Sequence, residues 1–158
     1  MKNLFVGIDP SLTETGLIIL GEDAKIIHQE LISTASNQEI ESRLLKIKNC
    51  ISSLLVNEKL EKFFYVSIEG LSFMSKGQAV TQLAGLHYLL RIFLYEREKD
   101  IIFDVIAPTA LKKFVSGKGN VKKELILLHV FKKWGIEFEN SNLADAYGLA
   151  RMALEDKL

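Results

Sequence analysis

Short apolar runs separated by polar turns occupy the first part of the chain. The runs cover 4–8, 16–20 and 26–32, and Gly21-Glu22-Asp23 separates the second from the third. Apolar runs of this length, bounded by turn residues, are typical of β-strands. The pattern therefore predicts three consecutive antiparallel strands.

Longer stretches with helical spacing follow and alternate with two more apolar runs. Hydrophobic residues three and four apart predict an amphipathic helix over 37–56, and the run 64–68 behind it predicts a buried parallel strand. Another strand is predicted at 103–106. Further helices are predicted at 78–96, from Pro108 onward, at 122–134 and at 141–155, the last capped by Asn140 or Ser141. We expect an α/β fold whose mixed five-stranded sheet has three antiparallel strands, then two parallel strands, and flanking helices.

Composition narrows the class of protein. The chain has 158 residues, of which 48% are hydrophobic and only two are proline, so we expect one folded domain spanning 1–158. A single cysteine, Cys50, excludes an internal disulfide and suits a reducing compartment. The apolar runs are too short for a membrane span, and we expect no signal peptide before the first strand. We expect a cytoplasmic protein.

The net charge is zero, but its distribution is uneven. Between 107 and 135 the chain carries seven lysines and one glutamate, a net charge of +6. These lysines are Lys112, Lys113, Lys118, Lys122, Lys123, Lys132 and Lys133. A basic lobe on a neutral protein steers polyanions to one face, although a solvated helix surface would have the same composition.

Three carboxylates stand where a metal site is expected. Asp9 ends the first apolar run, Glu69 ends the run 64–68, and Asp145 lies within the last predicted helix. Asp9 could instead bond to turn amides, and Asp145 could pair with Arg151. Glu69 is harder to explain otherwise, because Glu is poor in strands and rarely buried without a partner. If the two strands are neighbours, however, all three converge at one edge of the sheet and repel each other without cations. Carboxylate oxygens are the ligands that Mg²⁺ and Mn²⁺ prefer, which indicates phosphodiester chemistry.

Four motifs in order resemble those of RuvC-type Holliday junction resolvases of the small, phage-borne sort, which have a ribonuclease H-like fold. The first is the segment 7–16, Gly-Ile-Asp-Pro-Ser-Leu-Thr-Glu-Thr-Gly, and the second is Ile68-Glu69-Gly70 with Phe73-Met74 and Lys76 after it. The third comprises 107–109, the loop 117–119 and the pair Lys122-Lys123. The last is 142–146, Asn-Leu-Ala-Asp-Ala. The resemblance covers the whole chain.

The resemblance implies an endodeoxyribonuclease that resolves four-way junctions by metal-dependent paired nicking, leaving 5′-phosphate and 3′-hydroxyl ends. It assigns Asp9, Glu69 and Asp145 to catalysis and to two Mg²⁺ or Mn²⁺ ions, with Asp9 between them. Asn142 would assist as a ligand where relatives usually carry Asp or His. Lys123 would contact the scissile phosphate and count as catalytic. The residues implied in DNA binding are Phe73, as the aromatic wedge, together with Lys76, Lys112, Lys113, Lys118, Lys122 and Lys123.

The predicted helix 78–96 is apolar around nearly its whole circumference. One side would face the sheet, and the other is best explained by a second copy across a twofold axis, which predicts a homodimer. Leu86 and Phe93 are the first candidates for the outer face. His28, His87 and His129 lack paired ligand spacing and are not expected to bind metal.

Other functions remain open. The same fold would serve a broader branched-DNA or replication-fork nuclease, or the related class that trims ribosomal RNA. Because Asn142 leaves the metal site under-charged, a junction-binding protein with weak catalysis is a further alternative. The actin-like and sugar-kinase-like ATPases share the opening strand and Gly-Ile-Asp turn, but they need a duplicated domain, and we expect only one domain here.

Overall fold

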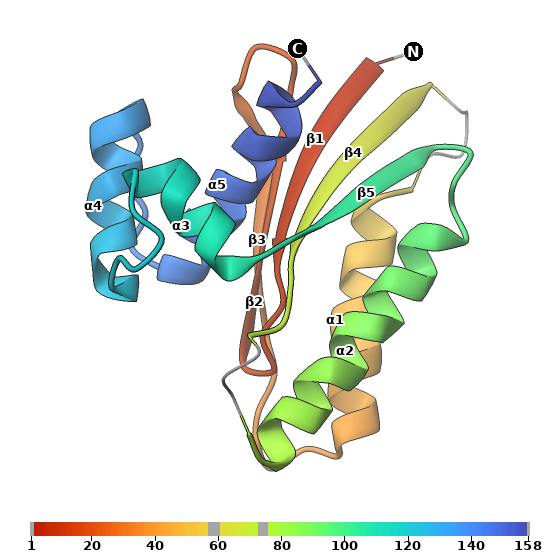
Figure 1. Cartoon of the computed structure of the whole chain (residues 1–158). Helices are drawn as coiled ribbons and strands as arrows, with labels where there is room; N and C mark the ends of the chain where they lie inside the picture. The colour runs from red at the N-terminus through yellow and green to blue at the C-terminus, as the bar shows by residue number, and fades with distance from the viewer. Residues whose placement is uncertain (1, 57–60, 73–75, 158) are drawn as a thin grey trace.

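One mixed sheet forms the centre of the structure (Figure 1). The computed structural model describes residues 2–56, 61–72 and 76–157. The strand order is β3-β2-β1-β4-β5, with β1, β2 and β3 antiparallel and with β4 parallel to both β1 and β5. The strands are β1 Lys2–Asp9, β2 Glu14–Leu20, β3 Ile26–Ser33, β4 Lys62–Glu69 and β5 Ile101–Ile106. The predicted mixed sheet of five strands is confirmed.

Helices cover both faces of this sheet (Figure 1). Two helices, α1 and α2, lie on one face, whereas α5 lies on the other with α3 and α4 packed around it. The helices are α1 Ile40–Leu54, α2 Gln78–Tyr95, α3 Pro108–Ser116, α4 Lys123–Trp134 and α5 Ser141–Glu155. All five predicted helices are present. The first begins three residues later than expected, because the backbone N–H of Gln38 bonds to the carbonyl of Ala35 in a turn. None of the helices in the described ranges is long and apolar enough to cross a membrane.

Alternation along β1 explains how one strand serves two cores. Leu4, Val6 and Ile8 point to the face covered by α1 and α2. Phe5 points to the opposite face, into the core that includes α5. Successive side chains of a strand point to opposite faces, so Asp9 shares the α5 face with Phe5 and Gly7. The first of the three carboxylates is thereby directed at α5.

Two glycines let α5 approach the sheet closely. A Cβ atom on Gly7 would lie 1.8 Å from the carbonyl oxygen of Ala146, and one on Gly16 would lie 2.3 Å from that of Asn142. No side chain fits at either position, because both obstacles are helix backbone. The lack of a side chain at Gly7 of β1 and at Gly16 of β2 therefore sets how closely α5 packs on the sheet, and with it the position of Asp145.

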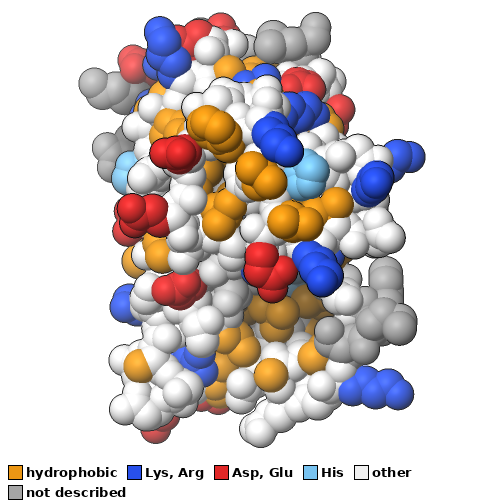
Figure 2. All heavy atoms as spheres, turned by 90° about the vertical axis from the view of Figure 1, so that its left-hand side faces the viewer, with side chains coloured by type: hydrophobic (Ala, Val, Ile, Leu, Met, Phe, Trp, Pro, Cys, Tyr) orange, Lys and Arg blue, Asp and Glu red, His pale blue; other side chains and the backbone are white. Residues whose placement is uncertain are grey.

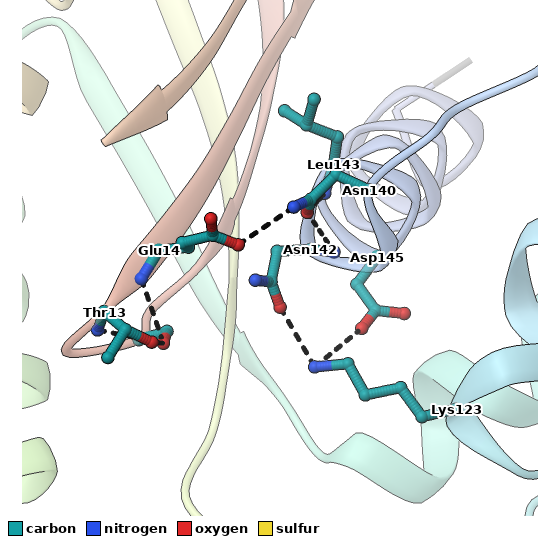
Figure 3. Close-up of polar contacts among 8 residues, drawn as sticks. Thr13, Glu14, Lys123, Asn140, Asn142, Leu143 and Asp145 are labelled. Atoms are coloured by element: carbon teal, nitrogen blue, oxygen red, sulfur yellow. Dashed lines mark hydrogen bonds and ion pairs between the residues drawn. The ribbon is translucent and has the colours of Figure 1, made fainter. Parts of the chain in front are cut away.

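The start of α5 is fixed by Asn140, one of the two predicted caps. Its side-chain oxygen accepts a hydrogen bond of 2.8 Å from the backbone N–H of Asn142 (Figure 3). Its amide group donates to Oε2 of Glu14 at 2.9 Å, which ties the helix to β2. An N-cap bond satisfies a backbone donor that the helix itself leaves unpaired.

The orientation of α2 differs from the prediction. Leu86 and Phe93, the expected outer residues, are buried against the sheet and α1. The outer face instead carries Tyr88, Ile92 and Tyr95, with 55%, 56% and 70% of their surface exposed. The helix is apolar on both sides as expected, but hydrophobicity alone could not tell its two sides apart.

Substituting the close-packed glycines should loosen α5. We expect Gly7→Ala to lower the free energy of unfolding by more than ~2 kcal/mol, because the added methyl group has no room to occupy. Gly85→Ala on α2 is the control, since its Cβ would lie 3.7 Å from Leu44 and alanine favours helix by up to ~1 kcal/mol. Urea unfolding of both variants measures the difference. Equal stability of Gly7→Ala and the wild type would contradict this account of the packing.

Candidate active site

The three predicted carboxylates meet at the carboxyl end of the parallel strands. Ile8 of β1 pairs with Ile68 of β4, so the residues that follow them, Asp9 and Glu69, lie side by side. Asp145 reaches them from the first half of α5. One side-chain oxygen from each of the three lies within 4.8 Å of the others. Residues that are 60 and 76 positions apart in the chain thus form one cluster.

The cluster is poorly compensated by hydrogen bonds. Asp9 and Asp145 are buried, and Oδ2 of Asp9 has no hydrogen-bond partner among the described residues. Burying an ionised carboxylate without a partner is costly, so such groups are usually neutralised or bind a cation. Three hard oxygen donors at this spacing, one of them unpaired, suit a divalent metal ion. The acidic trio could therefore hold a metal.

The pKa values of all three carboxyl groups are raised, as expected for crowded acids with little solvent around them. Burial raises the pKa of Asp9 well above its usual range, and the charges of Glu69 and Asp145 raise it further. Burial, followed by the charge of Asp145, raises the pKa of Glu69 to about 7. The pKa of Asp145 is raised to about 6 by burial, although Lys123 and Lys112 act to lower it. Near neutral pH, protons compete with any cation for this site.

Lys123 joins the cluster from the start of α4. Its Nζ donates a hydrogen bond of 2.9 Å to Oδ1 of Asn142 and lies 3.9 Å from Oδ2 of Asp145 (Figure 3). Asn142 and Asp145 are three residues apart and so share one face of α5. The structure therefore places Asn142 and Lys123, both predicted from the sequence, beside the carboxylates.

The three carboxylates line a cleft, and the other predicted residues differ in whether they line it too. Lys112 lines it and acts on the pKa of Glu69 and Asp145. Exposed positions are held by Lys76, Lys113, Lys118 and Lys122. Phe73, the predicted wedge, lies outside the described residues.

The face of the molecule on which α3 and α4 lie carries side chains of both charges. Figure 2 shows acidic and basic side chains adjoining a hollow floored by hydrophobic ones.

Not every lysine of the basic lobe is available to a ligand. Lys133 donates to the carbonyl of Phe114 and lies over the rings of Phe114 and Trp134, which gives it a structural role.

Sequence reasoning missed two residues beside the site. Buried Arg43 of α1 donates to the carbonyl of Leu12 at 2.8 Å and to Oγ1 of Thr34 at 2.9 Å, which holds the loop that follows Asp9. Buried His87 of α2 lines the cleft, and burial lowers its pKa. A polar residue inside an apolar helix pattern was the available signal for His87. No local signal marks Arg43, because its partners are distant in sequence.

Comparisons with known proteins identify the family of the chain. A family model described as "Crossover junction endodeoxyribonuclease RuvC" matches residues 5–152. The chain belongs to the RuvC family. RuvC of Orientia tsutsugamushi is 29% identical over 157 residues, covering 91% of this chain and 92% of the relative. RuvC of Corynebacterium efficiens is 23% identical over 151 residues, and this chain spans 66% of its length.

Solved structures support the same fold. Thermus thermophilus RuvC is similar with a TM-score of 0.76 at 21% identity, over 98% of this chain and 95% of that one. The structure of that protein in complex with Holliday junction substrate has the same TM-score at 20% identity, over 98% and 94%. The predicted ribonuclease H-like fold and the predicted RuvC family are thus confirmed. As a RuvC family member, the chain is a nuclease.

The raised pKa of Glu69 gives the metal-free protein a testable pH dependence. A carboxyl whose folded pKa lies near 7 instead of 4.5 stabilises the fold below pH 4.5, and this stabilisation is lost as the pH rises through 7. In EDTA at pH 8 we therefore expect Glu69→Gln to be more stable than the wild type, by up to ~3 kcal/mol. At pH 5 the difference should shrink.

Thermal unfolding at both pH values measures this effect, with Glu41→Gln on the exposed side of α1 as the control. That variant should differ from the wild type by the same small amount at pH 5 and pH 8. A Glu69→Gln variant that is less stable than the wild type at pH 8 would show that Glu69 is not under electrostatic strain.

Proposed function

We propose that this RuvC family nuclease resolves Holliday junctions by metal-dependent paired nicking, leaving 5′-phosphate and 3′-hydroxyl ends. The observation that carries the proposal is the convergence of Asp9, Glu69 and Asp145 in a cleft that Lys112 and Lys123 also line. Carboxylates suited to a metal, beside ammonium groups suited to phosphate, are what phosphodiester cleavage requires. The Thermus relative, solved with Holliday junction substrate, supports branched DNA as the ligand.

The metal we propose is Mg²⁺ or Mn²⁺, with two ions per site. Asp9 would contribute to both because its strand, β1, pairs with β4, which carries Glu69, and packs against α5, which carries Asp145. Glu69 and Asp145 would complete the set, assisted by the amide oxygen of Asn142. When bound, such ions activate a water molecule and neutralise the leaving oxygen.

The chain's own cations would position the DNA. Lys123 is held between Asn142 and Asp145, so its ammonium group lies where a scissile phosphate would approach the carboxylates. From its resemblance to the family's wedge residue, we also propose Phe73 as the aromatic that contacts the bases. Around Lys123 we propose a contact surface for the flanking phosphates. Its lysines are Lys76, Lys112, Lys113, Lys118 and Lys122. Charged contacts of this kind fix the register of DNA without reading its sequence.

We further propose that two copies assemble through the outer face of α2. An exposed stripe of Tyr88, Ile92 and Tyr95, spaced at helical intervals, is large for a solvent-facing helix surface. A twofold pairing would give two active sites for the two strands of a junction. Each copy would act as one nuclease domain, 1–158, in the cytoplasm.

Neutralising the carboxylates should separate catalysis from binding. We expect Asp9→Asn, Glu69→Gln and Asp145→Asn each to lower the cleavage rate at least ~100-fold, because each removes charge from the metal site. Junction binding in Ca²⁺ should be retained or tightened. Gel assays on a four-way junction, a replication fork and a linear duplex measure both properties, and cleavage of forks as fast as junctions would favour the broader branched-DNA nuclease. Near wild-type cleavage would remove the substituted residue from the site.

The exposed lysines should act through phosphate contacts. We expect Lys118→Ala and Lys122→Ala to weaken binding of all DNA sequences and to reduce the slope of log affinity against log salt by about 0.9 each. Lys99→Ala is the control, because Lys99 is exposed at the opposite end of the sheet, before β5. Fluorescence anisotropy between 50 and 200 mM salt, roughly the range over which such contacts differ most, measures the slope. An unchanged slope in both variants would mean that these lysines are solvated and do not contact phosphate.

A charge on the outer face of α2 should disrupt the pair. We expect Ile92→Lys to convert dimers to monomers without loss of folding, because Ile92 is exposed within each chain. Thr81→Lys, on the same helix but near its start, is the control. Light scattering across micromolar concentrations gives the mass of each. A monomeric wild type in that range would contradict the proposed assembly.

A further inference from the structure

His87 occupies an unusual position on the inner face of α2. Only 2% of its surface is exposed, and its helix neighbours Leu86 and Leu90 are buried in the core. Buried polar groups are nearly always hydrogen-bonded, so a histidine in an apolar face needs a partner. The partner here is the backbone of Glu69, one of the three clustered carboxylates.

The contact fixes one end of a single peptide group. Nε2 of His87 lies 3.0 Å from the carbonyl oxygen of Glu69. A carbonyl oxygen only accepts hydrogen bonds, so Nε2 carries the proton and donates it. The other ring nitrogen, Nδ1, is then an acceptor, and it has no partner among the described residues.

The other end of the same peptide group is fixed from β5. The backbone N–H of Gly70 donates to the carbonyl oxygen of Ile106 at 2.7 Å. The Glu69–Gly70 peptide is therefore held by α2 through its carbonyl and by β5 through its N–H. This is the point at which β4 ends and the chain leaves the sheet. At this strand end β5 restrains the peptide through its N–H, and His87 adds a second restraint at its carbonyl.

We propose that His87 is a positioning residue that locks the Glu69–Gly70 peptide and so directs the Glu69 carboxylate at Asp9 and Asp145. The inference rests on the proposed role of Glu69 as a metal ligand. The side chain of a residue follows the orientation of its peptide planes, so a rotation here would swing the carboxylate out of the cluster. In this role His87 acts on the metal site through the backbone of Glu69 and is not itself a metal ligand.

The test compares an isosteric donor with an apolar side chain. The amide nitrogen of glutamine can take the place of Nε2, whereas leucine fills the space without donating. We expect His87→Leu to weaken Mn²⁺ binding about 10- to 100-fold, as is typical when a group that orients a ligand is removed, and His87→Gln to stay within about threefold of the wild type. Calorimetric titration of the full chain with Mn²⁺ measures affinity without DNA or turnover.

Two further variants distinguish the possible failures. Leu90→Ala loosens the same helix face without touching Glu69, so it should lower the melting temperature and leave Mn²⁺ affinity unchanged. Glu69→Gln should weaken Mn²⁺ binding itself. If it does not, the proposed metal site fails. If it does while His87→Leu binds Mn²⁺ like the wild type, only the positioning role fails. Equal weakening by His87→Gln and His87→Leu would also overturn it.

The wild type offers a test that does not depend on any variant folding. Nitrogen-15 NMR distinguishes the two ring nitrogens of a histidine, and His87→Gln identifies which signal is lost. We expect His87 to be protonated at Nε2 and unprotonated at Nδ1. A proton on Nδ1 alone would mean that the ring does not donate to Glu69, and the proposal would be overturned.

Discussion

Mutual repulsion among three clustered carboxylates, two of them buried and one half-buried, is the constraint around which this nuclease is built. Asp9, Glu69 and Asp145 lie within 4.8 Å of one another, and burial raises the pKa of each. Left to itself, such a cluster would relax by moving apart or by taking up protons. The rigid backbone keeps the carboxylates from moving apart. Lys123 and Lys112 oppose the uptake of protons, because their charges lower the pKa of Glu69 and Asp145. Stability is thereby given up locally for a site that binds positive charge, as is common at active sites.

Rigidity comes from backbone contacts more than from side-chain packing. Parallel pairing of β1 with β4 fixes two of the acids, and the bare backbone at Gly7 and Gly16 fixes how near α5 brings the third. The Asn140 cap and the Arg43 contact then hold the two segments that border Asp9. These restraints come from elements far apart in the chain, so the geometry is a property of the whole fold.

The difference between local sequence patterns and contacts among distant elements explains what the sequence could predict. Strand and helix periods are local, and an acid at the end of each of two apolar runs was enough to place Asp9 and Glu69 together once parallel pairing was assumed. The roles of His87 and Arg43 were not predictable, because each depends on a partner that only tertiary structure brings near. The outer side of α2 could not be told from the sequence, because a helix that is apolar all round does not reveal which side faces the sheet. The first candidates, Leu86 and Phe93, are buried.

Asn142 shows how the balance of charge is adjusted within this frame. A carboxylate at this position would add a fourth negative charge to a corner where three already repel. The amide keeps an oxygen at the same place on the helix face, yet it accepts a hydrogen bond from Lys123 and adds no repulsion. Lys123 is thus held beside Asp145 by a neutral partner. The lower negative charge would reduce the attraction for the second of the two metal ions that we propose, while the tethered ammonium group supplies positive charge at the same point. Electrostatic compensation in this site would then be shared between the proposed metal and the protein's own lysine.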